Sequence, residues 1–243
     1  DYVKFQTFNP ELVVTAAAKQ ANYQTKNIGF NNTQLKMISN LKLSQNDFHK
    51  LYEFSNNRNI KFLSTAFDLS SVLFLKKLNI DFFKIPSGEI TNLPYLRLIG
   101  SFNLPILLST GMSSLSDIEN AIEVIESCGT DRKKITLLYC TTEYPAPFNE
   151  INLNVMSNLK KSFGTSIGYS DHTLGIEVPV AAVALGATVI EKHFTIDKNM
   201  PGPDHKASLD PNELEIMIKQ IRNIENALGN GLKRASPSEI KNR

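Results

Sequence analysis

The chain has 243 residues, of which 42% are apolar and 21% charged; this ordinary globular composition excludes a fibre, a disordered tail and a disulfide-stabilised scaffold. The 26 lysines and arginines nearly balance the 24 aspartates and glutamates and form no basic block, so we expect no nucleic-acid partner. No run of about 18 apolar residues predicts a membrane span, and with only two cysteines we expect a cytoplasmic protein.

Short runs rich in β-branched and aromatic residues predict strands along the whole chain. They cover residues 2–7, 61–64, 82–85, 105–109, 136–140, 166–170 and 188–193. Helical apolar spacing appears between and after them, at residues 48–55, 70–78, 93–99, 115–125, 153–163, 178–185 and 214–228. This alternation predicts a parallel sheet with crossover helices.

Two polar stretches interrupt the alternation. Residues 20–27 lie in a gap between 11 and 43 that is too long for a turn, and we expect a long, structured, functional loop there. Residues 230–243 predict a tail or linker after a domain of residues 1–229.

The repeated β/α units fit either an open doubly wound sheet or an eight-stranded barrel lacking one unit. No G-x-G-x-x-G motif follows a strand, which weakens the dinucleotide-binding version of the open sheet. Polar residues at the carboxyl ends of nearly all strands favour the barrel, because barrel enzymes build their sites there.

Lysines and hydroxyl residues recur at these strand ends. Period-two alternation places Lys4 and Gln6 on one face of the first strand, and Thr65, Lys84, Ser109 and Ser170 lie at or beside the ends of later strands. Such groups suit a small anion that carries phosphate and carboxylate oxygens. Each alone is more often a cap or a solvated side chain, and a Schiff-base lysine in an aldolase is a minor alternative for Lys84.

Two histidines end the last two predicted strands. His172 and His193 could meet over the barrel mouth and bind a divalent ion completed by a carboxylate or waters, although structural histidines are the plainer interpretation. Glu191 shares the strand face of His193 and is a candidate supporting group. Asp204 lies in a turn-rich loop, where it is either a turn-former or a site residue.

Six ordered motifs carry a resemblance that covers almost the whole chain. They are KFQT at 4–7, FLST at 62–65, KIPSGE at 84–89, LSTGM at 108–112, GYSDHT at 168–173 and EKHFT at 191–195. Together they resemble the bacterial sialic acid synthase family. The resemblance implies a (β/α)8 TIM barrel that uses Mn²⁺ or Mg²⁺ to condense phosphoenolpyruvate with an N-acetylmannosamine-type sugar. The products are a nine-carbon 2-keto acid and phosphate.

Matching the motifs position by position gives each residue an implied role. His172 and His193 match the metal ligands of the family. The phosphoenolpyruvate set comprises Lys4, Thr65, Lys84, Ser87, Ser109 and Ser170. The sugar set comprises Gln6, Glu89, Tyr144 and Asp204, and Glu89 is also a candidate for proton transfer. Thr142 stands where N-acetylneuraminate synthases often have Asn, and CTTEYPAP at 140–147 looks closer to the legionaminic acid branch, whose sugar is a 2,4-diacetamido-6-deoxy relative.

Members of the family begin with a further strand and end in an antifreeze-like domain that reaches the partner subunit. We therefore expect this chain to lack the first βα unit of the barrel, residues 230–243 to lead toward an absent antifreeze-like domain, and the full-length protein to be a homodimer. Two alternatives stay open at this point: a Schiff-base aldolase that uses Lys84, and a non-catalytic sugar- or anion-binding module.

Overall fold

Parallel strands in chain order form the centre of the molecule. The computed structural model describes residues 1–28 and 33–243; residues 29–32, part of the predicted loop region, lie outside it. The strands are β1 (Tyr2–Thr7), β2 (Lys61–Ala66), β3 (Phe83–Ile85), β4 (Ile106–Ser109), β5 (Ile135–Tyr139), β6 (Ser166–Asp171) and β7 (Ile190–Lys192). β1 pairs with β2, β3 to β7 form a second ladder in chain order, and β2 lies against β3. The seven predicted strands and the barrel-type α/β fold are confirmed.

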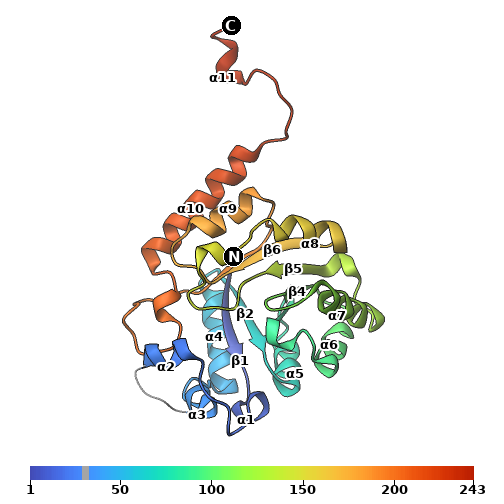
Figure 1. Cartoon of the computed structure of the whole chain (residues 1–243), viewed down its shortest axis with the longest axis vertical. Helices are drawn as coiled ribbons and strands as arrows, with labels where there is room; N and C mark the ends of the chain where they lie inside the picture. Colours follow the sequence, from blue (N-terminus) through green and yellow to red (C-terminus); the bar gives the residue numbers. More distant parts are fainter. Residues whose placement is uncertain (29–32) are drawn as a thin grey trace.

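Helices surround these strands (Figure 1). The main ones are α4 (Gln45–Asn57), α5 (Leu69–Lys77), α6 (Leu93–Gly100), α7 (Leu115–Ser127), α8 (Val155–Phe163), α9 (Glu177–Ala184) and α10 (Pro211–Leu228). Capping boxes on Ser44, Ser114 and Asp210 fix where α4, α7 and α10 begin. Each of the helical patterns predicted from the sequence therefore corresponds to a helix.

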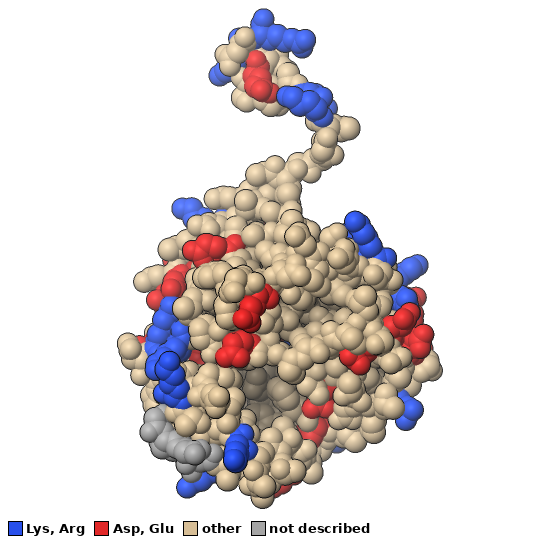
Figure 2. Space-filling view, in the orientation of Figure 1, with Lys and Arg blue, Asp and Glu red and all other residues tan. Residues whose placement is uncertain are grey.

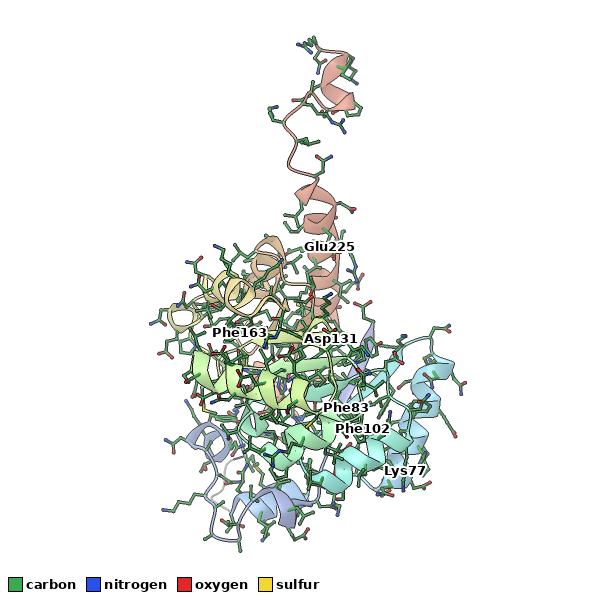
Figure 3. The ribbon with its side chains drawn as sticks, turned by 90° about the vertical axis from the view of Figure 1, so that its right-hand side faces the viewer. Lys77, Phe83, Phe102, Asp131, Phe163 and Glu225 are labelled. Carbon is green, nitrogen blue, oxygen red and sulfur yellow. The ribbon has the colours of Figure 1, made fainter. Side chains whose placement is uncertain are left out.

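The core lies between the strands and the helices. On β3, Phe83 and Ile85 are buried in the core, whereas Lys84 between them faces the other side of the strand and lines a cavity. Phe83 stacks on Phe102 with ring centroids 5.5 Å apart, and the two are neighbours in Figure 3. Burial of such a side chain contributes roughly 1.5–3 kcal/mol to the free energy of folding, so the packed core holds the polar strand ends in place.

The segment before α4 departs from the sequence prediction. Instead of a loop over residues 20–27, it contains α2 (Asn22–Ile28), flanked by the short helices α1 (Pro10–Val13) and α3 (Gln34–Ser39). None of the α2 residues is buried. Its partners come from distant loops instead, because Tyr23 stacks on Tyr144 and Asn27 Nδ2 donates to the Pro203 carbonyl at 2.7 Å. The loop prediction was wrong here because α2 has no apolar stripe that local periodicity could reveal.

The C-terminal segment leaves the body of the molecule after α10 (Figures 1 and 3). It is almost entirely exposed and contains one short helix, α11 (Pro237–Ile240), whose capping box joins Ser236 and Glu239. The domain and linker assignment at residue 230 stays a prediction. No helix in the described part of the chain is long and apolar enough to cross a membrane.

One buried hydrogen bond ties α6 to the end of β2. The Tyr95 hydroxyl donates to the Ala66 carbonyl at 2.7 Å, and both residues are buried. Tyr95→Phe should lower the free energy of unfolding by about 1–3 kcal/mol, because it leaves the carbonyl without a partner. Urea unfolding measures the loss, with Tyr52→Phe on the half-buried face of α4 as control. An equal change in the two variants would contradict this role.

Candidate active site

A cavity of about 530 Å³ opens at the carboxyl ends of the strands. Figure 2 shows a hollow in the lower half of the molecule, where Figure 1 places the ends of β1 and β2. Its volume lies in the range of small-molecule sites. Polar side chains from the strands line its floor, and apolar side chains from α1 and α3 line another wall. The cavity therefore has a polar end suited to an anion and an apolar wall suited to an organic substituent.

The structure brings nearly all the predicted site residues to this cavity. Those that line it are Lys4, Gln6, Thr65, Lys84, Ser87, Ser109, Thr142, Tyr144, Ser170, His172, His193 and Asp204. Glu89 is not among the described residues that line it, and its carboxylate instead accepts a hydrogen bond of 2.6 Å from Asn92 Nδ2. The role of Glu89 in proton transfer thus stays a prediction without support from this geometry.

Two lysines and a glutamate form the polar floor. Lys84, only 4% exposed, donates to Ser109 Oγ at 2.7 Å, and its Nζ lies 3.6 Å from Glu191 Oε1. Lys4 Nζ lies 4.0 Å from Glu191 Oε2, and Ser170 Oγ donates to Glu191 at 2.8 Å. We call Lys4, Lys84 and Glu191 the charged floor. Glu191 was only a candidate supporting group, and its position two residues before His193 was the signal for it.

Opposing effects set the protonation of the charged floor. Burial raises the pKa of Glu191, but Lys4, Lys84 and the Ser170 hydroxyl outweigh burial and bring this pKa to about 2. Burial lowers the pKa of Lys84, and the Glu191 carboxylate opposes that effect. The Glu191 carboxylate therefore opposes the loss of the Lys84 proton in a site that is otherwise desolvated.

His172 and His193 lie together beside this floor, with ring centroids 5.6 Å apart. His172 Nδ1 lies 2.6 Å from the Thr141 carbonyl, which fixes the orientation of the ring. Burial lowers the pKa of His172; burial, Lys4 and His172 lower the pKa of His193 to about 3. Burial therefore favours the neutral form of both rings, the state in which imidazole binds a metal.

The donors present fit a divalent ion that takes most of its ligands from water or substrate. The described residues contain no group of three or more histidine, cysteine, aspartate or glutamate side chains arranged for a metal. Asp204 Oδ2 lies 4.0 Å from His193 Nδ1, beside the ring. Two neutral imidazoles with open positions suit an octahedral ion that must also hold a substrate.

Close packing at Gly111 connects three strand-end loops. The Gly111 N–H donates to Ser87 Oγ at 2.9 Å, and Ser87 Oγ lies 3.4 Å from Cys140 Sγ. A Cβ at Gly111 would lie 2.5 Å from Thr142 Cγ2 and 2.9 Å from Ser87 Oγ, so a larger residue would displace these side chains. Ser87 and Thr142 were predicted site residues, whereas Cys140, which also lines the cavity, was not.

Three buried oxygens that line the cavity have no hydrogen-bond partner in the described part of the protein: Gln34 Oε1, Thr65 Oγ1 and Asp204 Oδ1. Buried polar atoms are nearly always paired, so unpaired oxygens in a cavity indicate hydrogen-bonding groups on a ligand. Burial also raises the pKa of Asp204.

The sequence profile of the NeuB family matches residues 1–233. The chain belongs to the NeuB family. It is 54% identical to the N,N'-diacetyllegionaminic acid synthase of Campylobacter jejuni over 242 residues, which are 100% of this chain and 72% of that protein. It is 45% identical to the enzyme of the same name from Legionella pneumophila, covering 99% of this chain and 68% of that protein.

The solved structures agree with this assignment. The N-acetylneuraminic acid synthetase of Leptospira borgpetersenii, solved with citrate, superposes with a TM-score of 0.85 and 31% identity, covering 99% of this chain and 79% of that one. The resemblance to the sialic acid synthases is therefore confirmed. These NeuB relatives are synthases of legionaminic and sialic acids.

Proposed function

We propose that this NeuB protein is a nonulosonic acid synthase that condenses phosphoenolpyruvate with an N-acylated mannosamine-type sugar. The observation that carries the proposal is one cavity that holds the charged floor and the His172–His193 pair side by side. The reaction consumes water, joins three carbons to six, and releases a nine-carbon 2-keto acid and phosphate. Similarity to the N,N'-diacetyllegionaminic acid synthases of Campylobacter jejuni and Legionella pneumophila supports a diacetamido sugar as the acceptor.

The charged floor supplies the anion site. Phosphoenolpyruvate carries about −2.5 to −3 charges at neutral pH, one from its carboxylate and the rest from phosphate. Two ammonium groups and one carboxylate give the floor a net charge of +1 (+2 − 1), and a divalent ion beside it would add +2. Ser109 and Ser170 hold Lys84 and Glu191 in position, so the cations are oriented before the substrate arrives.

The histidine pair supplies the metal site, for which Mn²⁺ or Mg²⁺ is proposed. Bound there, the ion would supply Lewis-acid polarisation of the sugar's aldehyde oxygen. His172 and His193 orient that end of the acceptor toward the anion held on the charged floor. Tyr144 packs on His172 with ring centroids 4.1 Å apart and shields this side of the site from water.

Phosphate release from phosphoenolpyruvate tests the proposal. Release should require an N-acylated mannosamine derivative and should stop when a chelator removes Mn²⁺. Release without any sugar, or no release with all components present, would contradict the proposed reaction.

A lysine-dependent aldolase is the second candidate, favoured by the burial of Lys84 and its lowered pKa. Schiff-base formation needs a neutral amine, whereas Glu191 and Ser109 stabilise an ammonium group. Borohydride treatment with a keto acid should leave Lys84 unmodified if the synthase assignment is correct. A reduced adduct on Lys84 would favour the aldolase.

A further inference from the structure

We propose that Gln34 of α3 recognises a second acylamino group of the acceptor, at the end of the sugar away from its aldehyde. This inference rests on the proposed function and assigns part of its substrate selectivity to one side chain. Gln34 belongs to the segment whose helices were not predicted from the sequence.

The side-chain oxygen of Gln34 is a buried hydrogen-bond acceptor without a donor. Gln34 lines the cavity, and its buried Oε1 atom has no hydrogen-bond partner among the described residues. An acceptor of this kind in a ligand cavity is satisfied by an N–H or O–H of the ligand. Asp204 Oδ1 is a second such acceptor in the same cavity.

Apolar neighbours on the same helix decide which kind of donor fits. Residues at i, i+3 and i+4 share one face of a helix, so Met37 and Ile38 lie on the face of Gln34. Both line the cavity together with Gln34. A hydroxyl group would donate to Gln34 Oε1 but would make no contact with the apolar side chains of Met37 and Ile38. An acetamido group places its N–H on Gln34 and its methyl group against Met37 and Ile38.

The start of α3 is held in place by backbone contacts. The Gln34 N–H donates to the Ala18 carbonyl at 2.9 Å, and Lys19 and Thr33 form an antiparallel bridge. The Gln34 side chain therefore projects from a fixed backbone position, as recognition of one substituent requires.

The position of the aldehyde decides which end of the sugar Gln34 meets. In the proposed reaction the aldehyde end lies between the histidine pair and the charged floor, at the strand ends. The open-chain sugar then extends from the strands toward the wall formed by α3. The substituents beyond C3 are the ones that reach Gln34, Met37 and Ile38.

Two sugars that differ only at C4 test this assignment. They are 2-acetamido-2,6-dideoxymannose and 2,4-diacetamido-2,4,6-trideoxymannose, titrated calorimetrically into the full chain without phosphoenolpyruvate. Wild type should bind the diacetamido sugar more tightly. In Gln34→Leu that preference should fall by about tenfold, the effect of leaving a ligand donor unpaired, with binding of the monoacetamido sugar nearly unchanged. Gln34→Glu keeps an acceptor and should retain most of the preference.

A surface variant and an activity measurement separate the possible outcomes. Gln220→Leu on the exposed side of α10 is the matched control and should bind both sugars as wild type does. Equal affinity of wild type for the two sugars, or equal losses for both in Gln34→Leu, would overturn the assignment. Phosphate release is measured separately. If wild type shows the binding preference and Gln34→Leu loses it, but no turnover is seen, the proposed function fails while the assignment of Gln34 stands.

Discussion

Replacing His172 or His193 by alanine is expected to abolish Mn²⁺-dependent phosphate release, a loss of at least about 10²-fold, because each change would remove one of the two protein ligands proposed for the metal. The fold should survive, since both rings line the cavity at the strand ends rather than the apolar core. Mn²⁺ binding, followed by electron paramagnetic resonance, should weaken in both variants. Circular dichroism should show wild-type secondary structure.

A histidine outside the site provides the control for these variants. His49 lies on the exposed side of α4 against Phe74, so His49→Ala should keep wild-type activity and Mn²⁺ affinity. Full activity of both His172→Ala and His193→Ala in chelator-treated, Mn²⁺-replete assays would show that the metal site lies elsewhere.

Replacing Lys84 by methionine should raise the KM for phosphoenolpyruvate far more than the KM for the sugar. A charge-assisted hydrogen bond from a buried ammonium group is worth roughly 1.5–3 kcal/mol, which corresponds to about 10–150-fold. Methionine is close to lysine in size, so the cavity should keep its shape. Steady-state kinetics with each substrate varied in turn measure the two effects.

The matched change at Lys77 tests whether any loss is specific. Lys77 ends α5 on the outer surface of the molecule, as Figure 3 shows, and Lys77→Met should leave both KM values unchanged. An unchanged phosphoenolpyruvate dependence in a folded Lys84→Met variant would remove Lys84 from the anion site.

Most of the fold could be predicted from the sequence because strands and helices alternate with clear periods. On α7, Ile118, Ile122 and Ile125 follow the Ser114 cap at helical spacing, and all three are buried. The same reasoning failed on α2, whose contacts come from distant parts of the chain: Tyr23 stacks on Tyr144, more than a hundred residues away. A contact of that kind leaves no trace in local hydrophobic spacing.

The site could be predicted in its composition but not in its internal contacts. Lys4 was expected on one face of the first strand and Lys84, Ser109 and Ser170 at or beside strand ends, and the barrel brings them together. Glu191 lies between the two lysines because β7 is close in space to β1 and β3. The spacing of these residues along the sequence does not reveal that proximity.

Gln34 and Cys140 escaped prediction for a related reason. Cys140 begins the CTTEYPAP motif but was given no role there, and Gln34 reaches the cavity from a helix that periodicity did not reveal. Glu89 was expected in the site because of its motif, but in the structure its carboxylate accepts a hydrogen bond from Asn92 instead.

Product analysis by mass spectrometry tests the central claim most directly, namely that the charged floor and the histidine pair form one site that joins phosphoenolpyruvate to an amino sugar. With phosphoenolpyruvate, 2,4-diacetamido-2,4,6-trideoxymannose and Mn²⁺, we expect one nine-carbon 2-keto acid for each phosphate released. Phosphate without the keto acid, or a keto acid that still forms after Lys84→Met and His193→Ala are combined, would contradict the account.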